Sequence, residues 1–135
     1  MSDPAFVLTS PNPFGLSDVG ADASPVLVDI DNDGDLDAFV GNATGNIQFF
    51  RNVGTVSNPI FTTAMANPFG LSAVGTSASP AFIDIDDDGD LDALVGNATG
   101  NMLFFQNIGT ASNPIFAAAI INPFGLSDVG SSASP

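Results

Sequence analysis

The chain lacks positive charge almost entirely. It contains no Lys and no His, and its single Arg, Arg51, stands against fifteen Asp, which gives a net charge of −14. Because phosphate backbones are bound through Lys and Arg, nucleic acid is excluded as a partner, and an anionic membrane surface is excluded for the same reason. The acid is concentrated: eleven of the fifteen Asp lie in two nine-residue windows, 29–37 and 84–92. A merely solubilising surface would spread its charges.

Several side chains that carry chemistry are also missing. Without Cys, no disulfide holds the fold. Without His, Lys, Glu or Cys, the usual general acids and bases are absent, so we expect that the chain is not an enzyme. Aspartate pairs act on glycosides in some enzymes, but here metal ligation explains them better.

No apolar run reaches the eighteen or so residues that span a bilayer. The first residues also lack the basic start and apolar stretch of a signal peptide, so for an exported parent protein we expect the signal outside this sequence. The hydrophobic content of 44% excludes outright disorder. Fourteen Gly and ten Pro favour short segments joined by tight turns.

The sequence repeats with a period of 55 residues. Phe14, Phe69 and Phe124 are spaced by this period, and residues 2–56 are identical to residues 57–111 at 35 of 55 positions without a gap. We divide the chain into a partial repeat (2–25, an outer strand and a connection), a first repeat (26–80) and a second repeat with its terminal connection (81–135). Because the chain begins and ends at different phases of the repeat, we expect a piece of a longer array or an engineered chain.

Each repeat predicts four short strands. In the first repeat these are residues 26–30, 37–40, 47–51 and 60–66, and in the second 81–85, 92–95, 102–106 and 115–121. The apolar run 26–30 predicts a strand buried on both faces. In the third strand, Phe49 and Phe50 should point to opposite faces. Four antiparallel strands in a repeat of this length predict an all-β fold of propeller blades, two complete blades per chain. A β-sandwich is the alternative.

A loop rich in aspartate follows the first strand of each repeat. In residues 29–37 the carboxylates of Asp29, Asp31, Asp33 and Asp37 occupy positions 1, 3, 5 and 9, and Gly34 occupies position 6. Calcium takes six to eight hard oxygen ligands, which such alternation can supply around a sharp Gly turn. Asp35 at position 7 is expected to offer its backbone carbonyl. The matching residues of the second loop are Asp84, Asp86, Asp88, Asp90 and Asp92.

Other readings of this loop are weaker. An EF-hand needs a bidentate Glu at position 12, where this chain has Val40 and Val95. Magnesium prefers one or two protein carboxylates with several waters, and zinc or copper prefers His and Cys. Solvated acidic turns are the alternative, but so many adjacent carboxylates repel one another when no cation neutralises them. We expect about one calcium ion per complete repeat, in a structural role.

The pattern Asp-x-Asp-x-Asp-Gly-x-x-Asp, followed by a Val-Gly strand end at Val40-Gly41 and Val95-Gly96, resembles the FG-GAP/VCBS repeats, the calcium-binding propeller blades of integrin α-subunits and bacterial surface proteins. Phe14-Gly15 and Phe69-Gly70 resemble the Phe-Gly of the family name. The resemblance implies an extracellular or cell-surface setting. It also implies calcium ligation by both loops, at Asp29, Asp31, Asp33, Asp35 and Asp37 and at Asp84, Asp86, Asp88, Asp90 and Asp92.

Two blades cannot close a propeller, which has about four to eight. We therefore expect a homo-oligomer, a trimer of six blades or a tetramer of eight, in which one of the two terminal copies of the outer strand is displaced. A lectin-like or other ligand-binding propeller is the alternative function, although sugar sites usually stack on Trp or Tyr and both are absent. Asn42 and Asn97 match the glycosylation sequon, but in a turn a structural Asn is the preferred interpretation.

Overall fold

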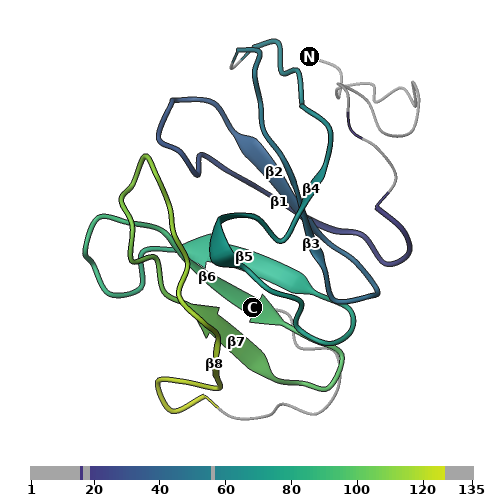
Figure 1. The fold of residues 1–135 in the computed structure, drawn as a ribbon, viewed down its shortest axis with the longest axis vertical. Coiled ribbons are helices and arrows are strands. Elements are labelled where there is room, and N and C mark those ends of the chain that lie inside the picture. Colours follow the sequence, from purple (N-terminus) through teal and green to yellow (C-terminus); the bar gives the residue numbers. More distant parts are fainter. Residues whose placement is uncertain (1–15, 17–18, 56, 127–135) are drawn as a thin grey trace, which may run out of the picture.

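The computed structural model describes residues 16, 19–55 and 57–126. Over these residues the chain forms two four-stranded antiparallel sheets, one per repeat, stacked beside each other (Figure 1). The first sheet contains β1 (Ser24–Val28), β2 (Asp37–Gly41), β3 (Ile47–Phe50) and β4 (Met65–Ala66). The second contains β5 (Ser79–Ile83), β6 (Asp92–Gly96), β7 (Met102–Phe105) and β8 (Ile120–Ile121). In both sheets the strands follow chain order. The predicted all-β class and the four antiparallel strands per repeat are confirmed.

The fourth strand of each repeat is shorter than predicted, because a bulge interrupts it. Met65 pairs with Phe49, whereas Phe61 forms a separate bridge with Asn52. Three residues, 62–64, therefore stand opposite two, 50–51, and the extra residue breaks the ladder. The second repeat does the same between its Asn107–Phe116 bridge and β8. The partial copy of this strand in residues 2–25 falls outside the described residues, as do Phe14 and Gly15.

The prediction that the first strand is buried on both faces is wrong. Side chains of β1 alternate between half-buried and exposed, and Leu27 is 57% exposed. In β5, Ile83 is 55% exposed. An isolated pair of sheets covers only one face of each of these strands, and the opposite face stays open. The prediction for the third strand is confirmed: Phe49 and Phe50 are both buried but belong to different hydrophobic clusters, on opposite faces of the sheet.

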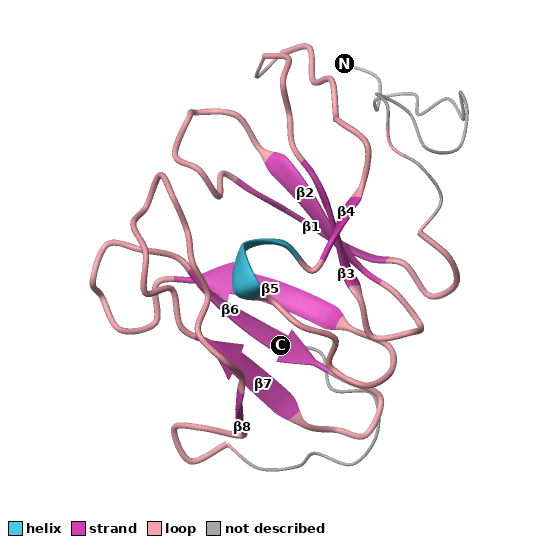
Figure 2. Cartoon of the chain, in the orientation of Figure 1, coloured by secondary structure: helices cyan, strands magenta, loops and turns pink. Residues whose placement is uncertain are grey.

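The main core lies between the two sheets. Phe39 of β2 is its centre, with its ring 4.7 Å from that of Phe49 and 4.3 Å from that of Phe82 in the other sheet. Phe49 in turn packs edge-on against Phe69, which belongs to the short 3-10 helix η1 (Pro68–Gly70), drawn in cyan between the sheets in Figure 2. Aromatic pairs in these geometries add to the free energy gained by burying their surface.

The connection between the sheets, residues 71–78, is fixed by backbone hydrogen bonds on both sides. Val74 N–H donates to Gly45 O and Ala78 N–H to Asn42 O in the first sheet's β2–β3 turn, while Ala98 N–H of the second sheet donates to Thr76 O. At this contact a Cβ on Gly41 would lie 2.0 Å from the Ala78 carbonyl oxygen, so only glycine fits. No helix in the described part of the chain has the length and apolar character to cross a membrane.

Candidate metal centre

Each aspartate loop joins the first two strands of its sheet and is shaped by its own carboxylates. Asp29 accepts hydrogen bonds of 3.0 Å from the backbone N–H groups of Asp33 and Gly34. Asn32 and Gly34 have φ values of 58° and 92°, which make the sharp turn. In the second loop Asp84 accepts the same two bonds. Partial desolvation raises the pKa of Asp84, but these hydrogen bonds outweigh it and hold the pKa below its usual value.

The ninth residue of each loop is anchored in the protein interior. Asp37 is fully buried at the start of β2, and its Oδ1 accepts a 2.9 Å hydrogen bond from Asn52 N–H at the end of β3. Its Oδ2 accepts a longer one, 3.4 Å, from Ile30 N–H. Burial raises the pKa of Asp37 to about 6, even though the bond from Asn52 lowers it. Asp92 makes the matching bond with Asn107 N–H, and burial raises its pKa too.

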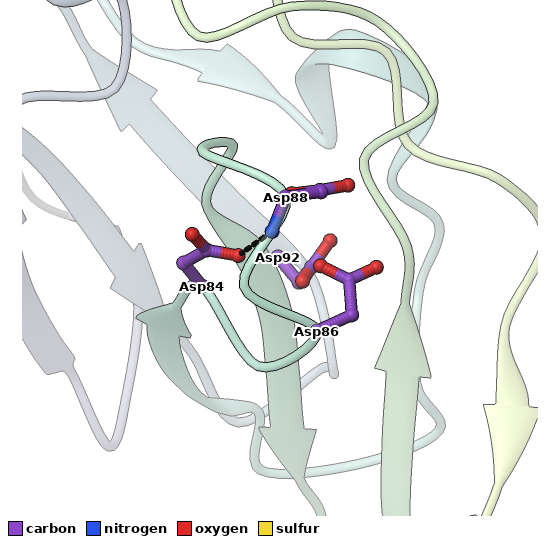
Figure 3. A group of neighbouring side chains, drawn as sticks. All are labelled: Asp84, Asp86, Asp88 and Asp92. Atoms are coloured by element: carbon purple, nitrogen blue, oxygen red, sulfur yellow. Dashed lines mark hydrogen bonds between the residues drawn. The ribbon is translucent and has the colours of Figure 1, made fainter.

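The structure brings most of the predicted ligands together. Carboxylate oxygens of Asp84, Asp86, Asp88 and Asp92 lie within 4.8 Å of one another, and Figure 3 shows these side chains around a common space. The first loop gathers only three of its carboxylates in this way. They are Asp29, Asp31 and Asp37.

Three predicted residues stand outside these groups within the described loops. Asp35 and Asp90, at position 7, are absent from them, and the expected ligation by their backbone carbonyls stays a prediction. Asp33 is also absent from the first group, although its counterpart Asp88 belongs to the second. The Oδ1 atoms of Asp33 and Asp88 both accept a 2.9 Å hydrogen bond from the backbone N–H two residues later, so this bond does not account for the difference.

The two loops differ in the residue that faces position 3. Arg51 Nη2 lies 2.6 Å from Asp31 Oδ2, whereas Gln106 Nε2 donates a 3.2 Å hydrogen bond to Asp86 Oδ2. The other oxygen, Asp31 Oδ1, is buried and has no hydrogen-bond partner among the described residues. Burial and the neighbouring Asp33 raise the pKa of Asp31, despite the opposite effect of Arg51. A buried carboxylate oxygen without a partner is costly unless a cation or donor satisfies it.

Four neighbours of the loops were not predicted from the sequence: Arg51, Gln106 and the anchoring Asn52 and Asn107. The spacing of the two asparagines from the ninth loop residue could have predicted their contact with it. Asn52 follows Asp37 by fifteen residues, and Asn107 follows Asp92 by the same interval, which two antiparallel strands and their turn span.

The preferred interpretation of the two sequon asparagines agrees with their environment. Asn97 is 6% exposed; its Nδ2 donates to Val74 O at 2.8 Å, and its Oδ1 accepts from Asn101 N–H and Thr99 Oγ1. Asn42 is equally buried and donates to Val19 O. Both side chains therefore hydrogen-bond the turn that contains them to the connection that precedes their sheet.

Comparison with known families agrees with this geometry. Residues 29–95, from the first loop into β6, match the model of the FG-GAP-like repeat. No curated protein and no solved structure matches the chain significantly. This segment is therefore similar to the FG-GAP-like repeats, a class of β-propeller-type repeat module, and the resemblance drawn from the sequence is confirmed.

Proposed function

We propose that the chain is a calcium-binding structural module of an extracellular or cell-surface protein, in which each repeat holds one Ca²⁺ at its aspartate loop. The observation that carries this proposal is the buried, unpartnered Oδ1 of Asp31 inside a cluster of carboxylates that recurs 55 residues later. The donor set fits the ion, because calcium prefers several hard oxygen ligands in a flexible shell.

The ligands available to the ion come from one hairpin. In the second repeat they are the side chains of Asp84, Asp86, Asp88 and Asp92, and in the first Asp29, Asp31 and Asp37. A bound cation supplies positive charge that offsets the mutual repulsion of these carboxylates. Since Asp37 and Asp92 are bonded to the backbone at the ends of β3 and β7, binding would tie the loop to three strands of its sheet.

A structural role follows from this arrangement. Ligands from a single hairpin stabilise that hairpin, and the part of the chain described here has no His, Cys, Lys or Glu beside the loops to perform catalysis. The proposal therefore assigns no enzymatic activity. The extracellular setting rests on the family, and millimolar extracellular calcium suits a site of modest affinity.

Calorimetric titration and thermal unfolding test the proposal. We expect about two Ca²⁺ per chain, and a melting temperature that is higher in calcium than in EGTA. Binding only to the folded state contributes about 2.7 kcal/mol per site at a hundredfold excess over Kd, so two sites would approach the total stability of a small domain. No heat of binding together with an unchanged melting temperature would contradict the proposal.

A matched pair of variants makes this test specific. Asp86→Asn removes an oxygen charge from the second cluster and should abolish or greatly weaken that site. Asp87→Asn removes a carboxylate from the same loop, but at a position where the first loop already carries Asn32. It should leave two sites per chain. Equal losses in both variants would indicate nonspecific charge attraction instead of a built site.

A further inference from the structure

Two surfaces form the contact between the sheets of one chain, and each repeat contributes one of them, called here the first side and the second side. The residues of each side recur 55 positions away in the other repeat. The first sheet contributes the face of Phe39, Phe49 and Phe69, and the second contributes Phe82 and Phe116. Because the repeats share one strand register, the second sheet also carries a copy of the first side, and the first sheet a copy of the second.

The copy of the first side is open on the second sheet. In the covered copy, Val28 is half-buried, Ile30 is 2% exposed and Leu71 is 5% exposed. Their counterparts in the second repeat are more exposed: Ile83 by 55%, Ile85 by 40% and Leu126 by 40%. Phe124 is 65% exposed, although its ring keeps the same edge-on contact with Phe104 that Phe69 makes with Phe49. Among the described residues, this is an apolar face without a cover.

The copy of the second side is only partly covered on the first sheet. Leu27 is 57% exposed, whereas its counterpart Phe82 packs against Phe39. Phe61 is half-buried, whereas Phe116 is only 4% exposed. Leu16 and Val19 of the preceding connection already pack on this face, as Leu71 and Val74 do in the contact between the sheets.

Backbone contacts also differ between the interface inside the chain and its open copies. Phe116 N–H donates to Phe69 O at 2.7 Å across the two sheets. The N–H of Phe61, at the same position of the first sheet, has no such partner among the described residues. A Cβ on Gly70 would lie 2.5 Å from Phe116 O, while the space around Gly125 is open within 4 Å.

We propose that a second copy of this chain covers the open face: the second sheet of one copy packs on the first sheet of the next and repeats the contact already present inside each chain. A second copy is the expected partner because the open face and the interface inside the chain are built from equivalent residues in the same register. A contact of this head-to-tail kind uses different surfaces on the two partners, so it continues until a ring closes. With two sheets per chain the ring holds an even number of blades, and three or four copies give six or eight.

Light scattering after size exclusion tests the association in the full chain with calcium present. The wild type should have three or four times the 13.6 kDa mass of one chain. Ile83→Glu places a charge on the open face of the second sheet, and Leu27→Glu places one on the first. Each should reduce the mass to that of one chain. Ile108→Glu is the matched control, since Ile108 is 64% exposed outside this face, and it should keep the wild-type mass.

Mixing the two variants distinguishes head-to-tail contact from other arrangements. Leu27→Glu retains an intact second sheet and Ile83→Glu an intact first sheet, so together they should form a dimer with one chain of each. A monomeric wild type, or a mixture that stays monomeric, would overturn the proposal, as would loss of association in Ile108→Glu.

Two controls separate association from folding and from metal binding. Circular dichroism should show the wild-type spectrum for every variant, and Leu126→Glu, outside the strands, serves if Ile83→Glu does not fold. Each monomeric variant should still bind about two calcium ions. Retained calcium binding with a monomeric wild type would overturn the association alone, whereas failure of calcium binding in an assembled wild type would contradict the proposed metal function alone.

Discussion

Arg51 forms an ion pair with Asp31, its Nη2 lying 2.6 Å from the carboxylate Oδ2, at the place where the second repeat has the neutral pair Gln106 and Asp86. It is the single basic side chain of the chain, and it lies at one of two otherwise similar carboxylate clusters. At the proposed sites, calcium would bind beside a positive charge in the first loop and would meet none in the second. The proposed sites should differ in affinity for this reason.

Arg51→Gln should tighten calcium binding at the first loop and make the two sites more alike. The guanidinium is 54% exposed, so screening limits its effect to about 1 kcal/mol, or roughly fivefold in Kd. Gln106→Arg should weaken the second site by a similar factor. Two-site calorimetric titration measures both changes. Unchanged stepwise affinities in both variants would show that the ion pair does not influence the sites.

Asp88→Ala should weaken calcium binding more than Asp90→Ala. Asp88 belongs to the converged carboxylate group and Asp90 does not, and a backbone carbonyl at position 90 survives the substitution. Loss of one carboxylate should cost about tenfold or more in affinity, the scale seen even for outer-shell partners. For Asp33→Ala against Asp35→Ala the order is the same but the expected difference is smaller, because the Asp33 carboxylate lies outside the first group. Equal affinities within each pair, measured by titration, would show that the assigned roles are wrong.

Asn97→Ala should destabilise the second sheet and its connection to the first. The substitution removes the bond to Val74 O and the two bonds from Asn101 and Thr99, at about 1 kcal/mol each, so a loss of about 2–3 kcal/mol in unfolding free energy is expected. Asn97→Asp keeps the acceptor but not the donor and should lie between. Urea unfolding measures the free energy of unfolding of the wild type and both variants. A loss of only a few tenths of a kcal/mol would argue against this structural role of Asn97.

Deletion of residues 1–10 should leave the proposed assembly intact. Ile120–Ile121 already pairs with β7, so the terminal copy of the outer strand completes the second sheet without help from the first copy, which lies outside the described residues. The truncated chain and the full chain should have the same number of copies by light scattering. Dissociation of the truncated chain alone would show that the initial segment contributes to the contact.

Local spacing in the sequence was enough to predict the local structure. The 55-residue period, the four strands per repeat and the turn at Gly34 depend on residues near one another in the chain, and the structure contains all of them. Alternating carboxylates brought Asp84, Asp86 and Asp88 to one side of a short loop, because a loop closed by a Gly turn has little freedom to place them elsewhere.

Contacts between strands were decided by the tertiary structure. The bulge opposite 50–51, the approach of Arg51 to Asp31, and the exclusion of Asp33 from its cluster depend on register and side-chain packing, which residue spacing does not encode. The same holds for the open and covered faces. Phe69 and Phe124 are the same residue in the same local sequence, yet one is half-buried and the other 65% exposed, because only the first has a neighbouring sheet in the chain to pack against.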